Sequence, residues 1–121
     1  MKIISSKVHG ILDYTMGILL IASPWLLDFA DNRTAMLIPI ILGIAMIGLA
    51  LITDYEMGAT PVISMAGHLT VDLISGIFLA VSPWLFGFAD DVYLPHLILG
   101  IAEVGASLMT ERSPGRRTSA V

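Results

Sequence analysis

The chain contains one segment twice, and this duplication limits the possible fold more than any other feature. Residues 9–31 align with residues 68–90 at a constant offset of 59, and 12 of the 23 positions are identical. After a two-residue shortening, the tetrapeptide LGIA at 42–45 recurs at 99–102. The alignment continues to the identical pair Thr53 and Thr110. We therefore interpret the chain as a tandem duplication of one structural unit.

Each copy of this unit contains two apolar stretches of similar length. The four stretches cover about 8–27, 35–53, 61–86 and 93–110. A helix needs about 20 residues to cross a hydrocarbon layer of about 30 Å, and each stretch is close to that length. Only 13% of the residues are charged and 56% are hydrophobic, whereas soluble domains carry about 25% charge. The sequence predicts an all-α, four-helix transmembrane bundle made of two tandem helical hairpins, in one membrane domain over 1–121.

The distribution of basic residues predicts how this bundle is oriented. Repeat one, at about 8–54, and repeat two, at about 61–111, each have two spans, so both insert the same way up. We expect a pseudo-twofold axis along the membrane normal. The side with both termini carries five of the six basic residues: Lys2, Lys7, Arg112, Arg116 and Arg117. The positive-inside rule then predicts cytoplasmic termini in a bacterial-type inner membrane, with residues 112–121 as a disordered basic tail.

The tripeptide Ser-Pro-Trp closes the first apolar stretch of each repeat. The two copies are Ser23, Pro24 and Trp25, and Ser82, Pro83 and Trp84. Proline lacks an amide hydrogen, so we expect each helix to kink or stop near the serine, which can also cap a new helical turn. The serine hydroxyl is one candidate partner for the carbonyl that proline leaves free. The tryptophans fit an anchor at the outer headgroup level, and a ligand site between the two indoles is the alternative.

The doubled motif resembles the SPW-repeat family of small bacterial and archaeal membrane proteins. The resemblance covers residues 8–111 and implies a membrane location and two helical pairs, but no activity. The second copy, from Ser82 to Phe88, fits the pattern best. The first copy departs from it at Asp28, which stands where the second has Gly87 and makes that outer turn more polar.

Polar residues inside the apolar stretches are the candidate functional residues. His9, Asp13 and Gly17 recur as His68, Asp72 and Gly76, and the four-residue spacing places each trio on one helix face. A third polar stripe follows His96, Gly100, Glu103 and Ser107, while the equivalent places in repeat one hold Pro39, Gly43, Met46 and Ala50. Ser64 and Ser75 extend the stripe of the third stretch. We expect all these stripes to face the interior or a partner chain, because buried polar groups need partners.

Three interpretations of these residues remain open from the sequence. In the first, the His-Asp pairs are structural and fix neighbouring helices to one another. In the second, His9, Asp13, His68 and Asp72 form a proton or small-cation path together with Glu103 at mid-span and His96 at the outer mouth. In the third, His9, Asp13, His68 and Asp72 converge to bind zinc or another divalent ion.

The sequence also excludes several classes of protein. Cysteine is absent, and the chain has no HExxH motif, glycine-rich phosphate loop or Ser-His-Asp arrangement. We therefore expect no enzymatic activity, no cofactor and no nucleic-acid partner. The expected partners are the lipid bilayer and further copies of the chain that associate through small-residue faces. The favoured interpretation is a structural or interaction protein of the membrane, and a transport-type protein is the alternative.

Overall fold

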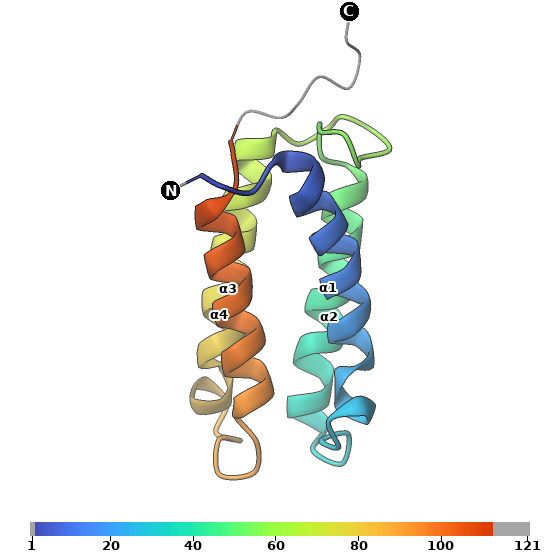
Figure 1. Ribbon diagram of the computed structural model, residues 1–121. Helices are drawn as coiled ribbons and strands as arrows, with labels where there is room; N and C mark the ends of the chain where they lie inside the picture. The colour runs from blue at the N-terminus through green and yellow to red at the C-terminus, as the bar shows by residue number, and fades with distance from the viewer. Residues whose placement is uncertain (1, 113–121) are drawn as a thin grey trace, which may run out of the picture.

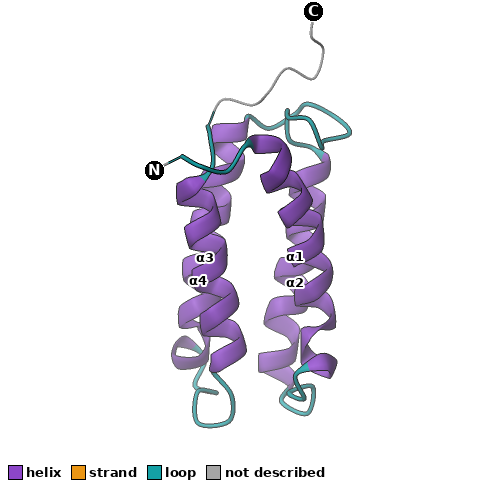
Figure 2. Cartoon of the chain, in the orientation of Figure 1, coloured by secondary structure: helices purple, strands orange, loops and turns teal. Residues whose placement is uncertain are grey.

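The computed structural model describes residues 2–112, which form four helices and, apart from two isolated bridges, no strand (Figures 1 and 2). The helices are α1 (Ser6–Leu26), α2 (Arg33–Leu51), α3 (Met65–Leu85) and α4 (Leu94–Met109). The predicted all-α, four-helix architecture is confirmed. The third helix begins later than its apolar stretch predicts, because residues 61–64 belong to the preceding loop and Ser64 caps α3 by accepting a hydrogen bond from the Gly67 amide.

The four helices form two hairpins that lie side by side. α1 packs along α2 and α3 along α4, whereas contacts between the hairpins are much sparser. The N-terminal residues and the 52–64 loop lie at one end of the molecule, and the two tight intra-hairpin turns lie at the other (Figure 1). Equivalent backbone pairings join the repeats at the first end, where Ile4 bridges to Thr110 and Ile63 to Thr53.

Glycine pairs set the close approach of the helices within each hairpin. A Cβ atom added to Gly43 would lie 2.6 Å from the Gly17 carbonyl oxygen, and one added to Gly100 would lie 2.6 Å from the Gly76 carbonyl oxygen. Real Cβ atoms do not approach backbone that closely, so these positions accept only glycine at the present helix separation. The small residues of the predicted stripes are thus used inside each hairpin.

The predicted stripes face the interior. The buried residues of α4 are His96, Gly100, Glu103 and Ser107, and those of α2 include Pro39, Gly43, Met46 and Ala50. His9, Asp13 and Gly17 are buried on α1, as are His68, Asp72 and Gly76 on α3. Ser64 was wrongly included in the stripe, because it is an exposed helix cap, and Ser75 is only partly buried.

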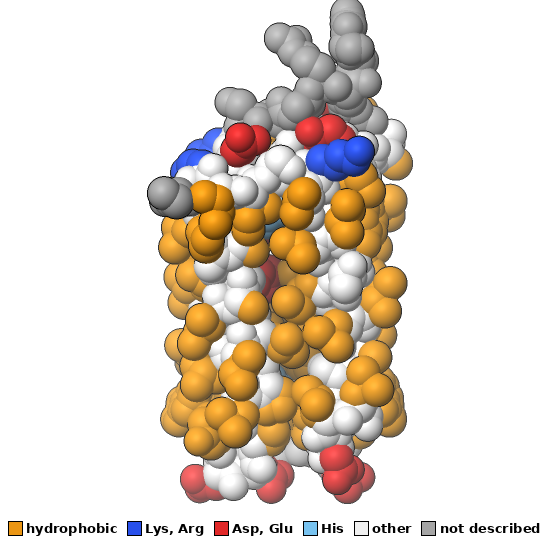
Figure 3. All heavy atoms as spheres, in the orientation of Figure 1, with side chains coloured by type: hydrophobic (Ala, Val, Ile, Leu, Met, Phe, Trp, Pro, Cys, Tyr) orange, Lys and Arg blue, Asp and Glu red, His pale blue; other side chains and the backbone are white. Residues whose placement is uncertain are grey.

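The outside of the bundle is an apolar belt between polar ends. Figure 3 shows hydrophobic side chains along the length of the helices, with Lys and Arg at one end and Asp or Glu at both ends. Ile18, Ile41 and Ile74 are each at least 60% exposed, although they are among the most hydrophobic side chains. Of the four predicted spans, α2 and α3 suffice by length and composition to cross a membrane. α1 does not meet that criterion, and α4, with 16 residues, is shorter than predicted.

The Ser-Pro-Trp motif lies inside the last turn of its helix and does not end it. α1 continues to Leu26 and α3 to Leu85, so each helix stops within one turn of the serine, three residues after it. Ser23 donates its hydroxyl hydrogen to the Leu20 carbonyl at 2.8 Å, and Ser82 donates to the Leu79 carbonyl at 2.7 Å. Those carbonyls would otherwise bond the amide hydrogen that proline lacks. The serine therefore compensates for the proline rather than starting a new helix.

The turn after each motif has the same geometry in both repeats. The Phe29 amide donates to the Pro24 carbonyl and the Phe88 amide to the Pro83 carbonyl, both at 2.8 Å. This 6→1 bond is part of a Schellman helix ending, which requires a left-handed residue just before it. Gly87 fills that position with φ 77° and Asp28 with φ 60°, so the sequence difference leaves the backbone turn unchanged.

The two tryptophans lie on the outer surface. Trp25 is 62% exposed and Trp84 is 54% exposed, with the Trp84 ring against Tyr93. A site formed by two facing indoles needs them buried toward each other, so the exposure favours the interfacial anchor.

Candidate functional site

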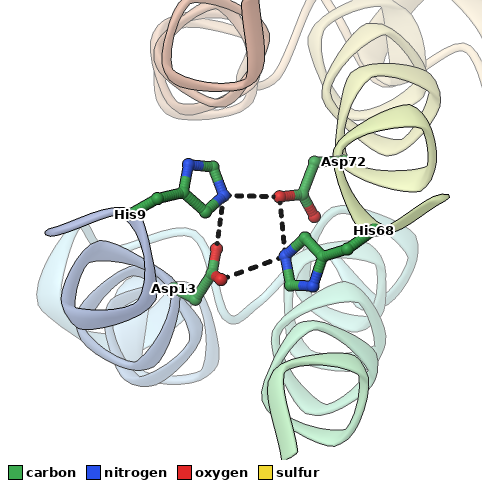
Figure 4. A group of neighbouring side chains, drawn as sticks. All are labelled: His9, Asp13, His68 and Asp72. Carbon is green, nitrogen blue, oxygen red and sulfur yellow. Dashed lines mark hydrogen bonds and ion pairs between the residues drawn. The ribbon is translucent and has the colours of Figure 1, made fainter. Parts of the chain in front are cut away.

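His9, Asp13, His68 and Asp72 converge between the hairpins and are named here the His-Asp quartet (Figure 4). α1 supplies the first pair and α3 the second, each with its two members one helical turn apart. One potential ligand atom from each residue lies within 4.8 Å of all the others. The four side chains are at most 4% exposed, so this polar group is buried, although three of its members line a cavity between the hairpins.

The imidazole and carboxylate groups alternate around the quartet. His9 Nε2 lies 3.1 Å from Asp13 Oδ1 and 2.8 Å from Asp72 Oδ2. His68 Nε2 lies 3.0 Å from Asp13 Oδ2 and 3.0 Å from Asp72 Oδ2. Each Nε2 therefore faces one carboxylate of its own hairpin and one of the other hairpin.

Threonine hydroxyls fix the other nitrogen of each histidine. Thr110 Oγ1 lies 2.8 Å from His9 Nδ1 and donates its own hydrogen to the Ala106 carbonyl at 2.5 Å. Thr53 Oγ1 lies 2.6 Å from His68 Nδ1 and donates to the Leu49 carbonyl at 2.6 Å. A hydroxyl has one hydrogen, so each threonine accepts a hydrogen bond from Nδ1. Both rings therefore carry a hydrogen on Nδ1.

The Nε2 atom of His68 is not satisfied by hydrogen bonding. It is buried at 3.0 Å from two carboxylate oxygens, yet neither contact has hydrogen-bond geometry within the described chain. The short distances are compatible with charge attraction, which depends little on direction. We therefore treat these contacts as ion pairs of a charged ring rather than as aligned hydrogen bonds.

Tyr55, from the loop between α2 and α3, completes the surroundings of Asp13. It is fully buried and donates its phenol hydrogen to Asp13 Oδ2 at 3.0 Å. Burial, and then the negative charge of Asp13, raise the pKa of the Tyr55 phenol well above its usual value, so the phenol remains a donor. Gly10 allows this approach, because a Cβ there would lie 2.9 Å from Tyr55 Cε2 and 2.4 Å from Met57 Cγ.

Glu103 lies beside the quartet but outside its network. Its side chain is 5% exposed, and neither carboxylate oxygen has a hydrogen-bond partner among residues 2–112. Two cavities of about 300 and 190 Å³ share Met46, Asp72 and Glu103 in their linings. Apolar side chains of α2 and α3 line the first, and those of α1 and α4 line much of the second. Glu103 therefore projects into the space between the hairpins.

His96 is separate from the quartet and lies near the opposite end of the bundle. Its Nε2 lies 2.9 Å from the Ala35 carbonyl and donates to it, because a carbonyl can only accept. The ring sits between Phe29 and Phe88, with both centroid distances at 4.9 Å. The structure thus brings together four of the six predicted polar residues, places Glu103 next to them and leaves His96 as a second tie between the hairpins.

Sequence reasoning did not identify Thr53, Thr110 or Tyr55 as site residues. The two threonines did carry a signal, because they are identical between the repeats and lie at the ends of the two second helices. Tyr55 carried no such signal, since its equivalent position in repeat two holds Arg112.

Comparison with known proteins adds one result to this geometry. The model of the SPW repeat domain family matches residues 7–110, which is nearly all of the chain that the structure describes. No curated protein and no solved structure matches the sequence.

Proposed function

The chain belongs to the SPW repeat domain family, and we propose that it is a structural protein of the membrane whose His-Asp quartet locks two helical hairpins together. The observation that carries this proposal is the set of cross-hairpin contacts. His9 of the first hairpin contacts Asp72 of the second at 2.8 Å, and His68 of the second contacts Asp13 of the first at 3.0 Å.

The lock is needed because the hairpins share little other surface. The extensive helix contacts lie within each hairpin, and cavities occupy part of the space between them. Lipid tails are as apolar as the helix surfaces, so hydrophobic burial does not drive helices together inside a bilayer. Buried polar contacts take over that role. Three further cross-hairpin contacts, from His9 to Thr110, from His68 to Thr53 and from His96 to Ala35, act in the same sense.

The quartet is balanced in charge when both imidazole rings are protonated. Two positive rings then alternate with two carboxylates, so no net charge is buried. Removing one member of such a buried arrangement leaves an unpaired charge and costs about 3–5 kcal/mol. The quartet is therefore a strong constraint on how the hairpins pair, even if a well-packed apolar replacement of all four residues were equally stable.

The proposed membrane placement rests on the apolar belt and on the basic residues. Lys2, Lys7 and Arg112 lie at the end with the N-terminal residues, whereas Arg33 lies at the start of α2 at the other end. Arg116 and Arg117, together with the rest of the predicted tail from 113 to 121, lie outside the described residues. We propose cytoplasmic termini, an inner-membrane location and a pseudo-twofold axis between the repeats, supported by the equivalent contacts of Thr53 and Thr110.

Stability and ion flux together test this proposal. Asp72→Asn should lower the free energy of unfolding in detergent by about 3–5 kcal/mol, whereas the exposed control Asp90→Asn should change it by less than about 0.5 kcal/mol. Liposomes containing wild-type protein should show the same proton and cation flux as empty liposomes. An unchanged stability of Asp72→Asn, in protein whose helical content matches wild type, would contradict the lock.

Glu103 favours a second candidate, the movement of protons or a small cation. A buried carboxyl without a hydrogen-bond partner is costly, and such groups inside membranes commonly mark ion pathways. Here both oxygens lie unpartnered, within the described chain, against two cavities that also reach Asp72. The liposome assay separates the candidates: a flux that Glu103→Gln abolishes while stability is retained would establish transport and displace the structural role.

A further inference from the structure

The hydrogen-bond pattern of the two histidines poses a problem at the centre of the quartet. Each Nδ1 donates its hydrogen to a threonine, so in a neutral ring the lone pair lies on Nε2. His9 Nε2 lies 2.8 Å from Asp72 Oδ2 with hydrogen-bond geometry, whereas His68 Nε2 lies 3.0 Å from one oxygen of each carboxylate without it. Lone pairs of nitrogen and oxygen repel at that distance. The centre of the quartet therefore requires positive charge, which either a hydrogen on each Nε2 atom or a bound cation supplies.

We propose that the His-Asp quartet binds one divalent transition-metal ion of the zinc class, through His9 Nε2, His68 Nε2 and one carboxylate oxygen each of Asp13 and Asp72. Zinc bonds to imidazole nitrogen and carboxylate oxygen are about 2.0–2.2 Å long, so neighbouring ligand atoms of a tetrahedral site lie about 3.3–3.6 Å apart. The observed nitrogen–oxygen separations of 2.8–3.1 Å are shorter than this, so the four side chains would have to move apart by about 0.5 Å to admit the ion. This inference rests on the proposed function, because the ion would sit in the same lock.

Charge balance and ligand type select the class of ion. The ion would replace the Nε2 hydrogens of the two charged rings, with release of two protons. Two neutral imidazoles and two carboxylates carry two negative charges, so a divalent ion leaves the buried site neutral. Imidazole favours Zn²⁺, Cu²⁺, Fe²⁺ and Ni²⁺, while the all-oxygen sites of Mg²⁺ and Ca²⁺ lack such ligands. Four protein ligands at most 4% exposed form a closed site, which is typical of structural rather than catalytic zinc.

The surroundings of the quartet also resemble the outer shell of a metal site. Metal-binding histidines usually donate their second ring hydrogen to an acceptor that fixes the tautomer and the ring orientation, and Thr53 and Thr110 do this here. Tyr55 similarly donates to Asp13 and orients its carboxylate. His68 is fully buried, and its Nε2 atom, which has no hydrogen-bond partner in the described chain, points to the centre of the quartet, where it could bind the ion.

Metal content and thermal unfolding of the purified full-length protein test the inference. Protein prepared without chelator, then incubated with Zn²⁺ and desalted, should retain one Zn²⁺ per chain. At a hundredfold excess over Kd, Zn²⁺ should raise Tm of chelator-treated protein by about 10 °C, whereas Mg²⁺ and Ca²⁺ should have no effect. Co²⁺ should bind with the visible absorption of a low-symmetry site. Asp72→Asn should abolish retention of Zn²⁺.

Two further variants keep the test valid if Asp72→Asn unfolds. Glu103→Gln alters a buried carboxyl beside the quartet that is not a ligand, so it should retain one Zn²⁺ per chain. Thr110→Val keeps all four ligands but removes the acceptor of His9 Nδ1, so its affinity for Zn²⁺ should fall about 10- to 100-fold. Equal Zn²⁺ binding by wild type, Thr110→Val and folded Asp72→Asn would overturn the assignment, as would the absence of binding by folded wild type.

The outcomes separate this inference from the lock itself. If folded wild-type protein binds no zinc-class ion but metal-free Asp72→Asn is destabilised, the lock stands and the metal site fails. If metal-free Asp72→Asn is as stable as wild type, the lock fails, whatever the metal content.

Discussion

Replacing Gly100 with alanine should force α3 and α4 apart, whereas the same change at Gly105, one and a half turns further along α4, should not. A Cβ at Gly100 would lie 2.5 Å from the Ala80 amide nitrogen, 2.6 Å from the Gly76 carbonyl oxygen and 2.7 Å from the Ala80 Cα. All three are backbone atoms and have no rotamer through which to move away. A Cβ at Gly105 meets nothing within 4 Å.

The two changes should have opposite effects on stability. Carbon atoms prefer separations of about 3.5–4.0 Å, so Gly100→Ala must move the helices apart by about 1 Å. Overpacking of this kind costs about 1–3 kcal/mol, and the helix preference of alanine returns up to about 1 kcal/mol. Gly105→Ala gains the helix preference of alanine and causes no overpacking. We expect Gly100→Ala to be destabilising by about 1–2 kcal/mol and Gly105→Ala to be stabilising by about 0.5–1 kcal/mol.

Equilibrium unfolding in detergent micelles, followed by circular dichroism, measures both changes against wild type under one set of conditions. Helical content before unfolding shows whether each variant has folded. If Gly100→Ala were as stable as Gly105→Ala, the close contact between Gly76 and Gly100 could not set the geometry of the second hairpin, and the account of its packing would be wrong.

Three further predictions concern the helix ends and Tyr55. Ser82→Ala should lower the free energy of unfolding by about 1 kcal/mol, because it removes the hydroxyl that donates to the Leu79 carbonyl. Adding Pro83→Ala should restore much of this loss, because alanine returns an amide hydrogen to that carbonyl. Equilibrium unfolding of the single and the double variant measures both effects. Asp28→Gly should raise Tm by relieving φ 60° at a non-glycine residue, and an unchanged or lower Tm would count against strain at that turn. Burial first and Asp13 second raise the pKa of the Tyr55 phenol. The stabilising effect of this phenol is therefore complete below the unfolded pKa of about 10 and is lost as pH rises above it. Between about pH 8 and pH 11 the free energy of unfolding should fall more in wild type than in Tyr55→Phe.

Much of the fold could be predicted from the sequence because the same pattern of buried polar and small residues occurs in both repeats. The repeat placed His9 and His68 in equivalent positions, and the four-residue spacing put Asp13 and Asp72 on the same faces. Helix periodicity is a local property, so it predicted the buried stripes of all four helices correctly, apart from Ser64. The meeting of the two His-Asp pairs also required the hairpins to pair along those faces, which polar residues in a membrane favour.

The remaining features depend on contacts that sequence periodicity does not encode. Tyr55 reaches Asp13 from a loop, and its position follows from how that loop folds over Gly10. The end of α1 also depends on a competition that the sequence alone did not resolve, between the break that Pro24 favours and the hydrogen bond that Ser23 makes to compensate for it. His96 lies on the predicted interior face, but its acceptor, the Ala35 carbonyl, belongs to the backbone of the other hairpin.

A double-mutant cycle between His9 and Asp72 tests the lock most directly, because the two residues belong to different hairpins and lie 2.8 Å apart. The free energy of unfolding of metal-free protein is measured for wild type, His9→Gln, Asp72→Asn and the double variant, with chelator present throughout. Direct contact predicts that the double variant loses less stability than the sum of the single variants, by at least about 1 kcal/mol. Losses that add to within about 0.5 kcal/mol would contradict a quartet that holds the hairpins together.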